Sequence, residues 1–218
     1  MEATIEQPQQ PLALRVMAHF FSVLFHPLFI PAYTVAFLFY FHPTFFAGFS
    51  LPDKYKILLS TLLNTVFFPA FSVLLMKGLG FIKSIRLPTQ QERIGPYLAS
   101  MIFYFWTAWV FFKYEPHPDP ALASFMTGVF LTSVAGLLAN IYFKISMHGM
   151  GIGGLIGFFL VIAQTNSMLM TWPLALALLI GGIVCTSRLL LRDHSNRDVY
   201  MGLLAGLLCQ FAAAFVIL

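Results

Sequence analysis

A histidine and an aspartate near the end of the chain have the spacing of a catalytic pair. His194 and Asp198 are four residues apart, which places both side chains on one face of a helix, within reach of each other. A carboxylate that accepts the Nδ1 proton of His194 fixes its tautomer and leaves Nε2 free as a nucleophile. Gly202 and Gly206 continue the same stripe, so this face is expected to pack closely against other helices. The alternative interpretation is a set of solvated anchors at a helix end.

Two further polar segments hold candidate partners for this pair. The segment 144–149 contains Ser146 and His148, and an earlier connection contains Arg86 and Arg93, seven residues apart. Guanidinium groups match the oxyanions of a phosphate. Taken alone, the first segment is typical of an interfacial histidine and the second of a cytoplasmic loop. Their combination with His194 is what indicates a phosphate site.

The composition indicates that these polar segments connect membrane helices. Hydrophobic residues make up 59% of the chain and charged residues 9%, whereas a soluble domain carries about a quarter charged residues. Long apolar runs favour helices over a barrel, whose strands show only short alternating segments. Cys185 and Cys209 lie inside apolar runs, so no disulfide framework is expected. We predict an all-α polytopic membrane helical bundle.

Seven apolar segments approach the length of about 20 residues that spans a bilayer. They lie near 17–42, 56–76, 96–112, 122–143, 150–165, 168–186 and 199–217. Six spans is the alternative, because Pro27 and Pro31 interrupt the first segment, whose beginning is then an interfacial helix. We expect one domain over residues 1–218, with a polar N-terminal segment over 1–16 that lacks the features of a signal peptide.

Two expected spans lie between each polar segment and the next, so all three should open on the same membrane face. The positive-inside rule places that face in the cytoplasm. If Arg86, Arg93 and Arg188 bind phosphate, however, they do not report topology. Both orientations therefore stay open.

The last polar segment resembles the third signature of the type 2 phosphatidic acid phosphatase superfamily. That signature is S-R-x5-H-x3-D, and every position is matched by Ser187, Arg188, His194 and Asp198. The three polar segments come in the order of the family's signatures. Together they cover roughly the C-terminal two-thirds of the chain.

The other two signatures are matched in part. The second, P-S-G-H, is matched by Ser146 and His148, with Ile145 and Met147 at the remaining positions. The first, K-x6-R-P, is matched in spacing by two arginines, and its proline is absent from the following position. Arginine for lysine keeps the positive charge. Methionine for glycine places a side chain where the family's backbone N–H faces the phosphate.

The resemblance implies a metal-independent lipid phosphatase with a phosphohistidine intermediate. His194 is implied to attack phosphorus, Asp198 to hold its imidazole, and His148 to protonate the leaving oxygen and then activate water. The implied phosphate-binding residues are Arg86, Arg93, Ser146 and Arg188. The substrate is a lipid phosphate or a polyprenyl diphosphate, with no cofactor and no nucleic-acid partner. We expect an integral multi-pass protein of the cell (inner) membrane.

A non-catalytic lipid-phosphate binder or transporter with a degenerate site is the alternative function. A transporter should carry polar residues at the membrane midplane on broken helices. The residues of this kind do not form matched halves of the chain: Asn64, Pro69, Asn140 and Pro173.

Two other patterns suggest a dinucleotide site and a metal site, but their surroundings in the sequence do not favour either. The string 149–154 fits G-x-G-x-x-G, but no strand precedes it, and Gly149, Gly153 and Gly157 instead form a small-residue ladder for helix packing. Four histidines fall on both faces of the expected topology without a carboxylate-rich ligand set, so no metal site is expected there: His19, His26, His42 and His117.

Overall fold

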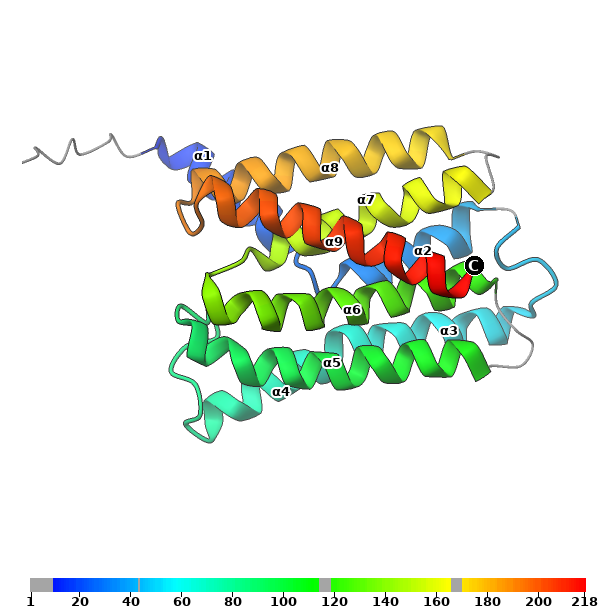
Figure 1. Ribbon diagram of the computed structural model, residues 1–218, viewed down its shortest axis with the longest axis horizontal. Helices are drawn as coiled ribbons and strands as arrows, with labels where there is room; N and C mark the ends of the chain where they lie inside the picture. The colour runs from blue at the N-terminus through cyan, green and yellow to red at the C-terminus, as the bar shows by residue number, and fades with distance from the viewer. Residues whose placement is uncertain (1–9, 43, 114–118, 166–169) are drawn as a thin grey trace, which may run out of the picture.

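The apolar segments form helices because, in lipid, each backbone polar group must find its partner within its own segment. The computed structural model describes residues 10–42, 44–113, 119–165 and 170–218. These residues form an all-α bundle in which the long helices run side by side and alternate in direction (Figure 1). The predicted fold class is confirmed.

The helix bounds follow the predicted spans closely after the first. The helices are α1 (Leu12–Leu24), α2 (Ile30–Phe41), α3 (Leu51–Leu62), a π-helical turn (Leu63–Phe67), α4 (Phe68–Gly78), α5 (Gln90–Lys113), α6 (Pro120–Tyr142), α7 (Met147–Thr165), α8 (Thr171–Leu190) and α9 (Asn196–Ile217). The α3–α4 unit, with its π turn, is one continuous apolar helix over Leu51–Gly78. Among the described residues, six helices are long and apolar enough to cross a membrane. The chain is an integral multi-pass membrane protein.

The prediction of one continuous span over 17–42 is wrong, because the chain breaks between α1 and α2. Pro27 lies in the break and cannot donate the backbone hydrogen bond that a continuous helix needs. Twelve residues of α2 extend only about 18 Å, less than the hydrocarbon thickness of about 30 Å. α1 packs against α8 and exposes Leu12, Phe20 and Val23 on its outer face. This agrees with the six-span alternative, in which the first segment begins as an interfacial helix.

Helices α7 and α9 approach until their backbones touch. A methyl group added at Gly153 would collide with the carbonyl of Leu203, and one at Gly206 would collide with the carbonyl of Met150. Gly149 likewise faces the backbone of α9. The predicted small-residue ladder is confirmed, and it is paired with the glycine stripe that continues from Asp198.

The polar connections gather at one end of the bundle, as predicted. The connections α4–α5, α6–α7 and α8–α9 all lie at the left-hand end of Figure 1, together with α1. At this end the side chain of Gln90 donates to the carbonyl of Asn140 at 2.7 Å, and that of Asn140 donates to the carbonyl of Gln90 at 2.8 Å. This reciprocal pair fixes the start of α5 against the end of α6.

The glycine contacts predict a specific loss of stability. Gly153→Ala should destabilise the protein by about 1–3 kcal/mol, because the added methyl meets backbone atoms that cannot rotate away. Gly182→Ala on α8 is the control, since open space surrounds that position; it should be neutral or stabilising by up to about 1 kcal/mol. Thermal unfolding of both variants in one detergent checks this. Equal melting temperatures would show that the α7–α9 contact is not tight.

Candidate functional site

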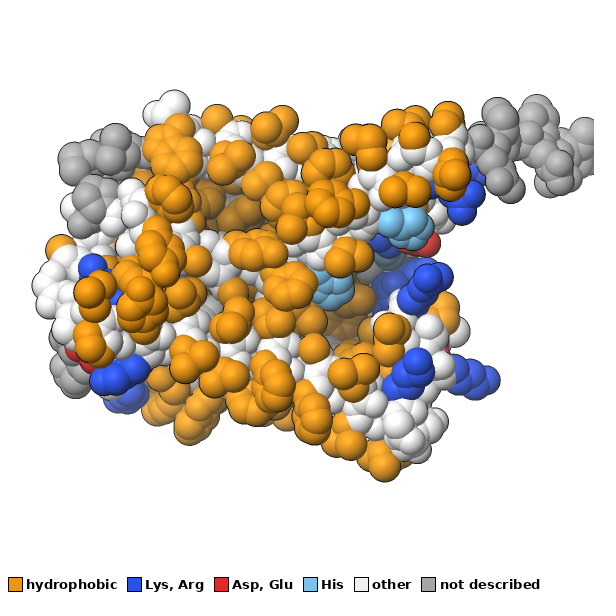
Figure 2. Space-filling view, turned by 180° about the vertical axis from the view of Figure 1, so that it is seen from behind, with side chains coloured by type: hydrophobic (Ala, Val, Ile, Leu, Met, Phe, Trp, Pro, Cys, Tyr) orange, Lys and Arg blue, Asp and Glu red, His pale blue; other side chains and the backbone are white. Residues whose placement is uncertain are grey.

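Positive side chains are concentrated at the end of the bundle where the three polar connections meet. Figure 2 shows lysine and arginine side chains gathered at this end, on the right in that view, close to histidine and acidic side chains. Helices α5, α7 and α9 all begin here. Their N-termini carry the positive ends of the helix dipoles. The arrangement favours an anion before any single contact is considered.

The start of α9 is fixed by a capping box. The backbone N–H of Ser195 donates to Oδ2 of Asp198 at 2.9 Å, and the backbone N–H of Asp198 donates to Oγ of Ser195 at 3.2 Å. Such reciprocal bonds satisfy two of the free N–H groups at a helix start. The Asp198 carboxylate is therefore held in place by its own helix end.

His194 lies just before this cap, with its side chain only 4% exposed. Its Nδ1 is 3.1 Å from the carbonyl oxygen of Lys144 and 3.9 Å from Oδ2 of Asp198. A carbonyl only accepts, so Nδ1 carries the proton and Nε2 has the free lone pair. The predicted pairing with Asp198 is present as a longer contact. The nearer acceptor, which the sequence did not predict, is the backbone of Lys144.

Ser146 links the second polar segment to the third. Its backbone N–H donates to the carbonyl of Asp198 at 3.1 Å, and its Oγ accepts from the N–H of Gly149 at 3.3 Å. The residue is completely buried. Met147, the first residue of α7, follows it in helical backbone, so methionine at this position needs no conformation reserved for glycine.

His148 faces the break between α1 and α2. Its Nε2 is 2.9 Å from the carbonyl oxygen of Ser22, so Nε2 carries a proton and Nδ1 is the atom able to exchange one. The ring of His26 packs edge-to-face on that of His148, with centroids 5.2 Å apart. Sequence reasoning set His26 aside. The available signal was the break at Pro27, which brings the end of α1 against α7.

Arg93 is buried at the start of α5, with 4% of its surface exposed. Its Nε donates to the carbonyl of Leu87 at 3.0 Å, and an Nη donates to the carbonyl of Ile145 at 3.1 Å. Leu87 has a left-handed backbone with φ of 49°, which is uncommon for a leucine and stores strain. This conformation occurs at the residue whose carbonyl holds the guanidinium.

Arg188 provides a second guanidinium from the end of α8. One Nη donates to Oδ2 of Asp193 at 2.7 Å, in a pair where the arginine side chain is 12% exposed and the aspartate 48%. The Nε of Arg188 is buried and has no hydrogen-bond partner among the residues that the structure describes. A buried donor without a partner costs stability. A bound oxyanion would supply the missing acceptor.

These cations act together on His194. Burial, together with the charges of Arg188, Arg93 and Lys144, lowers the pKa of His194 to about 4, against the opposing effect of its hydrogen bond to the Lys144 carbonyl. Burial and the nearby arginines also lower the pKa of Lys144. His194 is therefore neutral at pH 7, as a nucleophile must be.

One predicted site residue lies apart from this group. Arg86 is exposed on the connection before α5, where its backbone N–H donates to Oγ of Ser84 at 3.2 Å. The structure brings the other six predicted residues together around the starts of α7 and α9: Arg93, Ser146, His148, Arg188, His194 and Asp198.

The other histidines have separate surroundings. His42 lies at the far end of α2, and its Nδ1 is 3.2 Å from Oγ of Thr44. His117 lies outside the described residues. Within the part of the chain that the structure describes, no three His, Cys, Asp or Glu side chains are grouped so that they could hold a metal ion.

Comparisons with protein families, curated proteins and solved structures found no match to this chain.

Proposed function

We propose that this protein is a membrane phosphatase that hydrolyses a lipid phosphate or a polyprenyl diphosphate through a phosphohistidine on His194. The observation that carries the proposal is the state of this histidine. Its Nδ1 is bound by the Lys144 carbonyl at 3.1 Å, which leaves Nε2 as the nucleophile, and Arg93, Lys144 and Arg188 place positive charge around it. A nucleophile with adjacent oxyanion binders is the arrangement that phosphoryl transfer requires.

In the first step, the lone pair of His194 Nε2 attacks phosphorus and the bond from phosphorus to the leaving oxygen breaks. The electron pair of that bond stays on the oxygen, which takes a proton from Nδ1 of His148. The negative charge of the bound phosphate favours the doubly protonated imidazole of His148 that this step needs. The hydrogen bond from Nε2 to the Ser22 carbonyl keeps the ring oriented throughout.

In the second step, water releases the phosphate. Neutral His148 takes a proton from water at Nδ1, the water oxygen bonds to phosphorus, and the phosphorus–nitrogen bond breaks. Its electron pair returns to Nε2 of His194. Each histidine then has its starting protonation state, and the same group has served as acid and base.

The phosphate oxygens are bound by the guanidinium groups. Arg188 offers its unpartnered Nε, and Arg93 has further N–H groups beyond the two held by carbonyls. Ser146 acts as a positioning residue, because its hydroxyl caps α7 and its backbone holds Asp198. The Asp193 carboxylate occupies Arg188 at 2.7 Å and must give way to the substrate.

Trapping the phosphoenzyme separates the roles of the two histidines. With an activated aryl phosphate, His148→Ala should accumulate acid-labile phosphohistidine, because the leaving group needs no proton while water attack loses its base. His194→Ala should form none. The measurement is radiolabel retained on each variant after quenching into alkali.

His19→Ala is the control for this experiment, because His19 lies on α1 and has no role in the proposed steps; it should turn over as the unmodified protein does. Label on His194→Ala would remove the nucleophile assignment. An unlabelled His148→Ala that still binds the aryl phosphate would remove the assignment of the base.

Removing the competing carboxylate should strengthen phosphate binding. Asp193→Asn frees Arg188 for the substrate and should lower KM by up to about fivefold, because a partly exposed ion pair contributes up to about 1 kcal/mol. Asp53→Asn is the matched control, since Asp53 pairs with Lys56 at the opposite end of the bundle. The inhibition constant of inorganic phosphate, measured for both variants, compares their affinity for phosphate itself. A KM unchanged in Asp193→Asn would mean that phosphate does not use Arg188.

The charge around His194 predicts the acid limit of the reaction. Neutral His194 is lost as the pH falls through its pKa of about 4, so kcat/KM should fall only below about that pH. Lys144→Met removes one of the charges that lower this pKa while keeping the backbone carbonyl, so the acid limb should move to higher pH. Lys77→Met, at the end of α4, should leave it in place. If the acid limb lies at the same pH in the unmodified protein and in both variants, the charge of Lys144 does not act on His194.

A further inference from the structure

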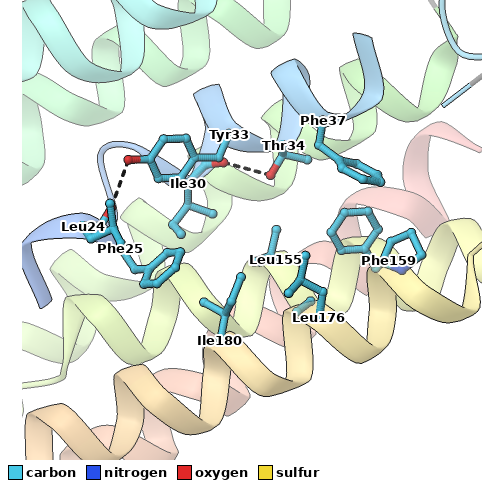
Figure 3. Close-up of a pocket in the computed structure, with 12 residues that line it drawn as sticks. Leu24, Phe25, Ile30, Tyr33, Thr34, Phe37, Leu155, Phe159, Leu176 and Ile180 are labelled. Carbon is cyan, nitrogen blue, oxygen red and sulfur yellow. Dashed lines mark hydrogen bonds between the residues drawn. The ribbon is translucent and has the colours of Figure 1, made fainter. Parts of the chain in front are cut away.

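An apolar cavity of about 340 Å³ lies between α2, α7 and α8 (Figure 3). α2 contributes Ile30, Tyr33, Thr34 and Phe37, and α7 contributes Leu155 and Phe159. The polar atoms of the wall are satisfied internally. The hydroxyl of Tyr33 donates to the carbonyl of Leu24 at 3.0 Å, and that of Thr34 donates to the carbonyl of Ile30 at 2.8 Å. The cavity therefore presents hydrocarbon to whatever enters it.

The end of α1 lies between the cavity and the polar site. Leu24 and Phe25 line it, while the neighbouring Ser22 bonds His148 and His26 packs on the His148 ring. Within residues 22–26, Ser22 and His26 therefore contact the polar site, and Leu24 and Phe25 line the cavity. Of the two histidines assigned to catalysis, His148 is the one on this side, and it is the one that protonates the leaving group.

Two of the helices that carry site residues, α7 and α8, also line the cavity. Leu155 is seven residues from His148, about 10 Å along α7, and Ile180 is eight residues from Arg188, about 12 Å along α8. The cavity therefore begins below the phosphate site and runs toward the middle of the membrane. Its mouth faces outward, because Leu24, Tyr33 and Leu176 in its wall are each exposed.

We infer that this cavity binds the hydrocarbon chain of the leaving group, so that the enzyme selects lipid phosphates by their chain. This inference rests on the proposed function. Phosphate at the guanidinium groups and a chain in the cavity place the bridging oxygen beside His148. The outward mouth lets a chain enter sideways from the bilayer without leaving the apolar phase. A site of this kind takes long-chain alkyl or prenyl phosphates in preference to water-soluble phosphate esters.

The test fills the cavity and uses a neighbour on the same helix as control. Ala177 is 2% exposed and lines the cavity, whereas Ala175, two residues away on α8, is exposed and does not. We compare Ala177→Phe and Ala175→Phe. Phosphate release is measured from a short-chain and a long-chain alkyl phosphate. Binding is measured in parallel as the thermal shift given by the matching non-hydrolysable alkyl phosphonates and by a long-chain alcohol.

The intact protein and Ala175→Phe should prefer the long chain, because each methylene buried in the cavity contributes roughly fourfold. Ala177→Phe should lose at least about tenfold of kcat/KM for the long chain and keep its rate on the short one. Its thermal shift should lose the same preference. If Ala177→Phe does not fold, Ala177→Leu fills less of the space and is used instead.

Three outcomes overturn the inference: Ala177→Phe keeps the chain preference, Ala175→Phe loses it equally, or the long-chain alcohol shifts the melting temperature as much as the phosphonate. The last result would mean that the charged head group adds nothing to binding, so that the cavity and the guanidinium groups do not hold one ligand together. If the intact protein binds long-chain phosphonate by this cavity and releases phosphate from neither substrate, the proposed phosphatase activity is refuted while the chain-binding site is supported.

Discussion

The close contact between α7 and α9 is the constraint on which the rest of the site depends. Glycines on both helices let the two backbones touch, and a methyl group at Gly153 or Gly206 would meet a carbonyl of the opposite helix. At this separation the N–H of Ser146 reaches the carbonyl of Asp198 at 3.1 Å. Lys144, just before this contact, then reaches His194 with its own carbonyl. A bulkier ladder would separate the two histidine-bearing segments by the width of a side chain.

The electrostatics of the site follow from where the helices end. Arg93 and the N-termini of α5, α7 and α9 bring positive charge or positive dipole ends to one place. Arg188 lies in the last turn of α8, at the negative end of that helix dipole, where a cation is favourable. Backbone carbonyls hold Arg93, and the carboxylate of Asp193 holds Arg188. A buried cation whose partners are neutral, as in the case of Arg93, is costly, and a bound phosphate would offset that cost.

The sequence predicted what depends on side-chain pattern and missed what depends on backbone position. Apolar length gave the spans, and glycine spacing gave the α7–α9 ladder. The prediction from apolar length also joined α1 and α2 into one span, because a proline indicates a break in the helix but does not show whether the chain changes direction there. The carbonyls of Ser22 and Lys144 have no signature, since any residue supplies one. His26 was missed for a similar reason: only the folded break brings it to His148. Arg86 had the right spacing, but its connection leaves it exposed.

Backbone carbonyls fix the two histidines in opposite tautomers, and this difference suits their proposed roles. Nδ1 of His194 donates to the Lys144 carbonyl, and Nε2 of His148 donates to the Ser22 carbonyl. The nitrogen with a free lone pair is therefore Nε2 in His194 and Nδ1 in His148. Nε2 is the nitrogen farther from the backbone, and in the proposed mechanism it attacks the phosphorus that the arginines bind. Nδ1 is closer to its own helix, and in the proposed mechanism it protonates the leaving oxygen in the part of the site where His26 packs on the His148 ring. Because carbonyls cannot be exchanged by substitution, each tautomer is maintained by the fold itself. Side-chain changes at 22 or 144 should therefore alter charge and packing while leaving the choice of nitrogen intact.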